Sequence, residues 1–245
     1  MTEVFTKTYP DPDRARTAAH HHQWLADLGA PVPELHALDS SGLLFRHLHG
    51  RRAHRNDLPA IASLLGQLHG RAHRTQLHTA RLDQDFTTRC GLTLAGFIAP
   101  RHARLHRHLQ QGLITSGQLH HATGMLAHAQ AQHAAFYKDT NIRNVLITRS
   151  GPMLVDFDDL TLAPFGYDLA KLLLSAAMTY GHLPSNIYAT ALAAYNDGVQ
   201  AEGEPASACP WNDLAQWLEL QHLLTIGYLG HNGYRHRWDA VRPWS

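Results

Sequence analysis

Apolar positions follow two different periods along this chain of 245 residues. Short apolar runs predict strands at 4–9, 35–38 and 43–45 in the first part of the chain. Between the first two runs, apolar residues at helical spacing predict a helix over 13–28, which must end before Pro31 because proline cannot continue a helix. The beginning of the chain is therefore predicted to be mixed in structure.

The chain beyond Gly50 has a mostly helical pattern. Apolar residues return three or four positions apart in five segments, which predicts helices at 57–69, 93–110, 116–133, 169–176 and 214–224. Two short apolar strands, 145–147 and 153–155, flank a turn at 150–152. We therefore expect a small mixed lobe over residues 1–49 and a larger, mostly helical lobe over residues 50–245.

Composition narrows the function without defining it. Hydrophobic residues make up 44% of the chain, as in globular proteins, and the formal net charge of +1 gives no basic excess that would indicate a nucleic-acid partner. The N-terminus lacks the apolar run of a signal peptide, and no segment is long and apolar enough to cross a membrane. Cys90 and Cys209 form no CxxC motif, so we expect a protein of the reducing cytoplasm.

Histidine is the exception in this composition, with 21 residues. The run His20-His21-His22 and the pair His102 and His106 have the spacing of metal ligands. A zinc site needs three or four convergent ligands, and histidines are scattered over the whole chain. We therefore interpret them as a compositional bias on solvated helix faces, with a metal site as the alternative.

Three polar residues lie beside apolar strands at a spacing that suits phosphoryl transfer. Asp139 lies five positions before Asn144, and Asp156 ends the next strand. A hairpin can bring the three side chains to one edge, where Asn144 and Asp156 could supply the oxygen ligands that magnesium prefers. Asp139 would then accept a hydrogen bond from an incoming hydroxyl and orient it.

These segments resemble those of the aminoglycoside phosphotransferases and the related choline-type kinases. The pattern Asp139-x4-Asn144, followed by Leu154-Val155-Asp156-Phe157, is similar to their catalytic loop and metal-binding motif. Three further segments match in order, so that the resemblance runs from Lys7 to Tyr180: Trp24-Leu25 with Pro31-Val32-Pro33, Leu64 to His69, and Gly166 to Ala170.

The resemblance implies a two-lobed α+β fold of the protein-kinase type, with Mg²⁺ and ATP or GTP as cofactors. It implies a role for each matching residue: Asp139 as catalytic base, Asn144 and Asp156 as magnesium ligands, Asp168 as a brace of the catalytic loop, Lys7 on the α- and β-phosphates, and Arg46, His47 and Leu48 along the adenine.

The sequence departs from the family pattern in three places. Lys138 replaces the Gly or Arg before the catalytic Asp, and it either stabilises the transferred phosphate or points to solvent. Only six residues precede Lys7, so we expect the glycine-rich hairpin to be absent and nucleotide alone to bind weakly. The helix position that normally holds the carboxylate partner of Lys7 falls near Ala18 or His20, so no partner is evident, and Asp158 and Asp159 are interpreted as surface turn residues.

The leading prediction is a kinase that phosphorylates a hydroxyl of a small molecule, such as an aminoglycoside-like compound or an aminocyclitol, in resistance or biosynthesis. If the acceptor is cationic, we expect it to face acids from the helices beyond residue 168, namely Asp197, Glu202, Glu204, Asp213 and Glu219. One alternative is a choline- or ethanolamine-type kinase, with an aromatic cage drawn from Trp211, Trp217, Tyr228, Tyr234, Trp238 and Trp244. The other is a non-catalytic binding module with a kinase-like fold.

Overall fold

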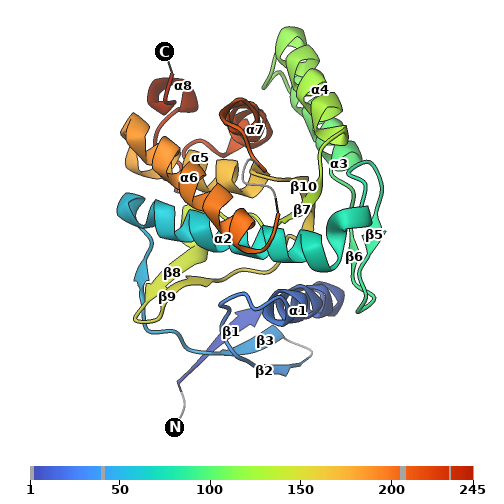
Figure 1. The fold of residues 1–245 in the computed structure, drawn as a ribbon, viewed down its shortest axis with the longest axis vertical. Coiled ribbons are helices and arrows are strands. Elements are labelled where there is room, and N and C mark those ends of the chain that lie inside the picture. The colour runs from blue at the N-terminus through green and yellow to red at the C-terminus, as the bar shows by residue number, and fades with distance from the viewer. Residues whose placement is uncertain (1–2, 40–41, 205–207, 232, 245) are drawn as a thin grey trace.

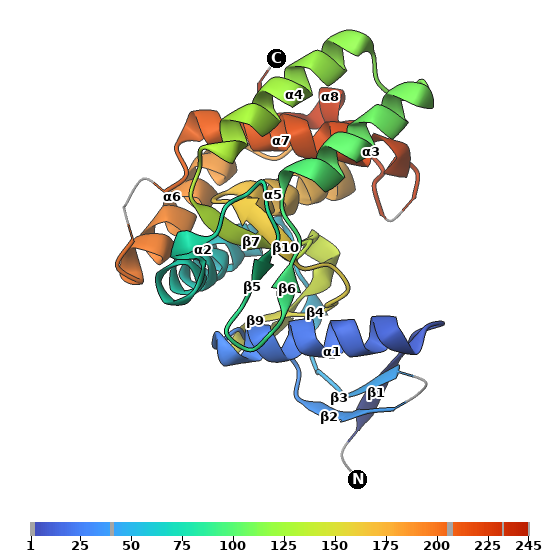
Figure 2. The same ribbon diagram turned by 90° about the vertical axis from the view of Figure 1, so that its right-hand side faces the viewer.

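A computed structural model describes residues 3–39, 42–204, 208–231 and 233–244. A small lobe lies at one end of the molecule and a larger helical lobe at the other (Figures 1 and 2). The small lobe holds an antiparallel sheet in the order β1-β3-β2, packed against α1. The elements of this lobe are β1 (Val4–Thr8), α1 (Pro12–Asp27), β2 (Leu35–Leu38) and β3 (Gly42–Arg46).

The helix of the small lobe begins where its sequence predicts. The Asp11 side chain caps α1 by accepting from the backbone N–H of Asp13, and Pro12 occupies the first turn, where no N–H is needed. Trp24 and Leu25 are buried on its inner face. The predicted helix over 13–28 and the three predicted strands are therefore confirmed to within a few residues.

The larger lobe holds three small sheets among its helices. Its helices are α2 (Leu58–Thr75), α3 (Ile98–Gln110), α4 (Ser116–Gln130), α5 (Tyr167–Tyr180), α6 (Ser185–Ala201), α7 (Trp211–Thr225) and α8 (Trp238–Val241). Its strands are β4 (Arg51–Arg52), β5 (Phe86–Thr87), β6 (Thr93–Leu94), β7 (Ala134–Tyr137), β8 (Val145–Thr148), β9 (Gly151–Leu154) and β10 (Thr161–Pro164). The strand orders in the three sheets are β10-β7, β4-β8-β9 and β5-β6. Among the described residues, no helix is both long and apolar enough to cross a membrane.

Two glycines allow α2 and α6 to pack with their backbones in contact. A Cβ at Gly66 would overlap the carbonyl oxygen of Tyr195, and a Cβ at Gly198 would overlap that of Ser63. This close approach positions His69 of α2 to hydrogen-bond the Tyr195 hydroxyl at 2.8 Å. Of these two helices, α2 packs against strands β7 and β9 of the larger lobe (Figure 1).

The sequence pattern missed some short elements. Residues 93–110 were predicted as one helix, but 93–94 pair with 86–87 in a hairpin and the helix begins only at Ile98. The turn predicted at 150–152 lies one position earlier, because Gly151 and Pro152 already pair within β9. The segment after Arg46, for which no strand was predicted, contains β4, and β4 pairs with β8 inside the larger lobe.

Candidate active site

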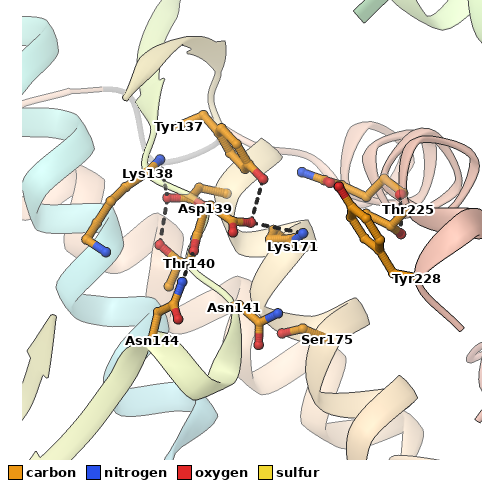
Figure 3. Close-up of polar contacts among 12 residues, drawn as sticks. Tyr137, Lys138, Asp139, Thr140, Asn141, Asn144, Lys171, Ser175, Thr225 and Tyr228 are labelled. Atoms are coloured by element: carbon orange, nitrogen blue, oxygen red, sulfur yellow. Dashed lines mark hydrogen bonds and ion pairs between the residues drawn. The ribbon is translucent and has the colours of Figure 1, made fainter. Parts of the chain in front are cut away.

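The loop that follows β7 holds Asp139 in a rare backbone conformation. Asp139 has a φ of 57°, and Asp156 has a φ of 69°; no other non-glycine residue in the described ranges has a positive φ. Such conformations are costly and persist only where the surrounding structure fixes them. The Tyr137 hydroxyl donates to Asp139 Oδ1 at 2.7 Å, and Lys171 Nζ lies 2.9 Å from the same oxygen (Figure 3).

A buried carboxylate fixes this loop from below. Asp168, at the start of α5, is fully buried and accepts three hydrogen bonds: from the backbone N–H of Lys138 at 3.1 Å, and from the N–H and hydroxyl of Thr140 at 2.8 and 2.7 Å. The three donors flank Asp139 on both sides. Asp168 therefore fixes the loop by bonding Lys138 and Thr140, the residues on either side of Asp139, and makes no hydrogen bond to the Asp139 carboxylate itself.

Lys138 does not lie where a catalytic cation would act. Its side chain is buried, and its Nζ donates to the backbone carbonyls of Val155 and Asp156 at 2.7 and 2.6 Å. Both readings of Lys138 made from the sequence therefore need correction: it faces neither solvent nor the site. Lys138 instead holds the backbone at Asp156, the second residue with a positive φ, by donating to its carbonyl and to that of Val155.

The lysine of the small lobe finds its partners in the larger lobe. Lys7 Nζ lies 2.5 Å from Asp156 Oδ1 and 2.7 Å from Asp158 Oδ1, and the Tyr9 hydroxyl also donates to Asp158 at 2.7 Å. Together the two carboxylates outweigh burial and raise the pKa of Lys7. The expectation that Lys7 lacks a partner is thus wrong, and so is the interpretation of Asp158 as a surface turn residue.

The buried rings of three elements hold the Asp156–Asp158 turn in place. Phe157 packs against His22 and Phe45, with ring centroids 4.8 and 5.9 Å apart. His21 donates to the carbonyl of Phe157 at 2.8 Å. Because burial outweighs that hydrogen bond, the pKa of His21 lies below its usual value and the ring is neutral. Helix α1 therefore contacts this turn through the imidazoles of His21 and His22, and not through the carboxylate that kinases of this type normally place on this helix.

Asn144 and Asp156 line one cavity with Asp139. This central cavity has a volume of about 210 Å³, and its other walls are Asn141, Arg143, Lys171, Tyr228 and Tyr234. Asn144 Nδ2 donates to the Asp139 carbonyl at 3.0 Å, which leaves its amide oxygen available. Asp156 also keeps a second carboxylate oxygen, since Lys7 bonds only Oδ1. Two oxygen donors at one cavity wall fit a magnesium ion.

The residues predicted along the nucleotide base line a second cavity. This interlobe cavity, of about 190 Å³, is bounded by Lys7, Arg46, His47 and Leu48, with apolar walls from Phe5, Pro33, Phe45, Leu146, Val155 and Phe157. Asp156 lies at its inner end and also lines the central cavity. The two cavities are thus neighbours that share the Asp156 side chain.

A third cavity lies on the other side of Asp139. This α3–α7 cavity, of about 310 Å³, has walls from α3, α7 and the start of α5, and it shares Asp139, Lys171 and Tyr228 with the central cavity. The sequence did not indicate Lys171, and it indicated Tyr228 only as a candidate for an aromatic cage. Lys171 follows the Tyr-Asp-Leu-Ala run by one residue, so its place on the same face of α5 as Asp168, one helical turn on, was the available signal.

The ion pair with Lys171 determines the charge of Asp139. Burial alone would raise the pKa of Asp139, but the Lys171 ammonium and the Tyr137 hydroxyl outweigh it and hold that pKa below its usual value of 3.8. Asp139 is therefore ionised at neutral pH. A carboxylate with so low a pKa is a weak base, so it suits orienting a hydroxyl more than removing its proton early.

The acids proposed for a cationic acceptor lie away from these cavities. Asp197 is exposed on α6, Asp213 pairs with His128 at 2.9 Å, and Glu219 accepts from the Trp238 indole at 3.0 Å beside a separate cavity under α8. Glu202 pairs with Arg71 and Arg74. None of them lines the central or the α3–α7 cavity, because their helices turn those faces elsewhere.

The aromatic residues of the C-terminal part do not form one cage. Trp217 and Trp238 are buried, and Trp244 packs edge-on against Trp238 with centroids 6.0 Å apart. Tyr228 and Tyr234 line the central cavity, but Arg104 and Lys171 already lie over their rings at 5.3 and 6.0 Å. An aromatic cage for a quaternary ammonium is therefore not present among the described residues.

The histidines are less exposed than their sequence setting suggested. His21, His22, His69, His73 and His108 are buried, so the assignment to solvated helix faces is wrong for these five. Each hydrogen-bonds a backbone carbonyl or a tyrosine hydroxyl. In the described ranges, only Glu3, His47 and His49 bring three candidate metal ligands together, at the surface.

Comparison with known proteins identifies the class of this protein. The sequence profile of the phosphotransferase enzyme family matches residues 3–211. The chain therefore belongs to this family. It is 27% identical over 111 residues to an N-acetylmuramate/N-acetylglucosamine kinase of Neisseria meningitidis serogroup B, a match that covers 44% of this chain and 32% of that kinase.

Solved structures of kinases for small molecules share the fold. The macrolide 2′-phosphotransferase MphH of Brachybacterium faecium superposes with a TM-score of 0.60 at 17% identity, over 100% of this chain and 86% of that one. Amicoumacin kinase hAmiN, solved with AMP-PNP, Ca²⁺ and its substrate, gives a TM-score of 0.63 at 13% identity, over 91% and 73% of the two chains. The predicted two-lobed kinase-like fold is thereby confirmed.

Proposed function

We propose that this protein transfers the γ-phosphoryl group of ATP or GTP to a hydroxyl of a small molecule. The observation that carries the proposal is the continuous series of three cavities, joined first at Asp156 and then at Asp139. A kinase needs a nucleotide site, a metal-bound phosphate and an acceptor hydroxyl in line, in that order. We assign residues 1–49 to the nucleotide base and residues 50–245 to the metal and the acceptor.

The nucleotide would enter from the interlobe cavity. Its base would lie against Phe45, Leu48 and Leu146, and Lys7 would leave Asp156 to contact the phosphates. Asn144 and Asp156 would hold magnesium, which neutralises the charge of the triphosphate. The solved complex of amicoumacin kinase with AMP-PNP and Ca²⁺ supports a nucleotide and a divalent ion as the ligands of this fold.

Asp139 would orient the acceptor for attack. The acceptor oxygen forms a bond to the γ-phosphorus, the bond from that phosphorus to the β,γ-bridging oxygen breaks, and the nucleoside diphosphate leaves. The hydroxyl proton passes to the Asp139 carboxylate as the new bond forms. Lys171 would keep that carboxylate charged, and Arg143 would face the transferred oxygens, since its Nε has no hydrogen-bond partner within the described part of the chain.

The ion pair between Lys7 and Asp156 gives one reason to keep a non-catalytic binding module as the second candidate. It occupies the carboxylate that would hold the metal, as in a protein that never binds one. Against this reading, a binding module has no need for the strained backbone at Asp139 and Asp156. The two candidates differ in one measurable property, which is acceptor-dependent turnover.

The test is a phosphoryl-transfer screen on the purified chain. Labelled ATP and GTP are supplied with Mg²⁺ or with EDTA, over a panel of sugars, amino sugars, amino alcohols, nucleosides and hydroxy acids. We expect transfer that needs both Mg²⁺ and one class of acceptor. Binding of Mg-nucleotide without transfer to any acceptor would support the binding module, and a chain that binds no nucleotide would refute both.

A further inference from the structure

The α3–α7 cavity is rich in cations. Its walls include four cationic side chains, Arg101, Arg104, Arg107 and Lys171, against two carboxylates, Asp139 and Asp159. Lys171 is paired with Asp139 at 2.9 Å, so its charge is already balanced. Three arginines then remain against Asp159 alone. A cavity of this charge attracts anions and repels an acceptor that carries several amines.

Arg101 is a buried cation without an acidic partner. Its residue is 8% exposed, and its guanidinium donates to three neutral groups: the Tyr167 hydroxyl at 3.2 Å, the Phe97 carbonyl at 3.0 Å and the Thr161 hydroxyl at 3.1 Å. It has no carboxylate within 4 Å among the described residues. The guanidinium also lies over the rings of Phe97, Tyr137 and Tyr167, with Cζ 4.0, 5.3 and 5.0 Å from their centroids. Ring faces and neutral acceptors thus hold Arg101 in place, while its positive charge is not neutralised by a carboxylate.

Two more arginines follow Arg101 along the same helix. Arg104 and Arg107 lie three and six residues further on in α3, which places all three along one side of the helix. Arg104 donates only to the Tyr228 hydroxyl, at 2.7 Å, and neither arginine forms an ion pair with a described residue. Their forked donors match the geometry of a carboxylate or phosphate group.

These arginines do not belong to the nucleotide. None of the three lines the interlobe cavity or the central cavity, where Lys7, Arg143 and Lys171 already supply cations. They are connected to Asp139 through Tyr137 instead: Arg101 Cζ lies 5.3 Å from the Tyr137 ring centroid, and the hydroxyl of that ring donates to Asp139. Arg101 and the orienting carboxylate are therefore joined by a single tyrosine side chain, and Arg104, Arg107 and Asp139 line the same cavity.

We propose that the acceptor is a small hydroxylated acid. Its acidic group binds Arg104 and Arg107 with Arg101 behind them, while its hydroxyl lies at Asp139. This inference rests on the proposed phosphotransfer and names the chemical class of its acceptor. It replaces the expectation of a cationic acceptor, since the acids proposed to receive one lie elsewhere. A carboxylate and a phosphate would be recognised by the same donors, so the experiment includes both.

The experiment compares each acid with a neutral partner of the same shape. The pairs are D-gluconate with D-gluconamide, N-acetylmuramate with N-acetylglucosamine, and glycerol 3-phosphate with glycerol. Two readouts are taken: phosphoryl transfer from Mg-ATP, and the shift in unfolding midpoint with Mg-AMP-PNP present. We expect at least one acid to be preferred over its partner in both.

Arginine variants then assign the preference to the cavity. The double variant R104Q/R107Q should raise the KM of the preferred acid by about 10- to 100-fold, which is the usual effect of losing hydrogen bonds to a charged group. The KM of a neutral acceptor should change much less, because it makes no such bonds. R149Q is the matched control, since Arg149 is exposed on the turn after β8 and lines none of the three cavities.

The outcomes separate this inference from the proposed function. If no acid binds better than its neutral partner, or if the double variant affects acids and neutral acceptors alike, the inference is overturned. Transfer to neutral or cationic acceptors in preference to every acid would overturn it too, while leaving the phosphotransferase proposal intact. An absence of magnesium-dependent nucleotide binding would refute both. Preference for glycerol 3-phosphate over the carboxylates would support the anion site and identify phosphate as its ligand.

Discussion

The interlobe cavity and the α3–α7 cavity obtain their chemistry in different ways. The interlobe cavity is mainly apolar, and its few polar groups come from β1, the segment after β3 and the turn after β9. The α3–α7 cavity is polar and charged; its cations come from α3 and α5, and its carboxylates Asp139 and Asp159 come from loops. The family resemblance predicts residues of the interlobe cavity, whereas no sequence motif indicates the α3–α7 cavity. The cavity that we propose for the nucleotide can therefore be predicted from the sequence. The cavity that we propose for the acceptor cannot.

Asp139 stands between these regions, and its removal should have the largest effect. We expect Asp139→Asn to lower kcat by about 100- to 10,000-fold, because the amide cannot receive the hydroxyl proton. The affinity for Mg-ATP should stay unchanged, since Asp139 does not line the interlobe cavity. Turnover and calorimetry on the same preparation measure both. Asp197→Asn, on the exposed face of α6, is the control, and a shared loss in both variants would contradict the assignment.

Asp156 should affect the nucleotide side. Asp156→Ala removes the carboxylate at the metal wall, so we expect Mg-ATP affinity to fall by about 100-fold and to lose its magnesium dependence. Asp158→Ala is the matched comparison, because it removes the other partner of Lys7 and leaves the metal wall intact. Equal effects of the two variants on magnesium dependence would place the metal elsewhere.

Lys171 should connect the two regions through the charge of Asp139. Without its ammonium, burial is left to raise the pKa of Asp139, because no opposite charge at that position favours the ionised carboxylate any longer. Activity requires the carboxylate, so the acid limb of kcat/KM should move to higher pH in Lys171→Met and return in Lys171→Arg. The pH profiles of the three proteins decide this. A uniform loss of activity with an unmoved acid limb would show that Lys171 acts only on folding.

Neutral histidines beneath both regions should make stability depend on pH. Burial lowers the pKa of His21 and His108 and brings that of His69 to about 3. Below pH 6.5 the unfolded chain binds protons that the folded chain excludes, so stability falls as pH falls, by up to about 1.4 kcal/mol per pH unit for each histidine.

Thermal unfolding between pH 7.5 and 5.5 measures this slope. His69→Gln should flatten it, because the variant removes the group with the lowest of these pKa values. His120→Gln, at an exposed position of α4, is the comparison variant. If the unfolding midpoint of the unaltered protein stays constant over this range, the buried imidazoles are not neutral as described.

The sequence by itself determined the fold and the edge at which we propose that a metal binds. Asp139, Asn144 and Asp156 lie within 18 residues on a loop and a hairpin, so local geometry is enough to bring them together. Helical spacing likewise predicted α1 and α2, since a regular apolar face requires only short-range pattern. This part of the site therefore follows from contacts between residues that are close in the chain.

The tertiary structure decided which groups pair and which charged side chains line a common cavity. Lys7 meets Asp156 from 149 residues away, and Lys138 turns inward to carbonyls 17 and 18 residues on. The arginines of α3 become a binding surface only because α7 and α5 close the cavity around them. A charge on a helix looks alike in sequence whether it faces solvent or a cavity, because burial depends on the elements that pack beside it.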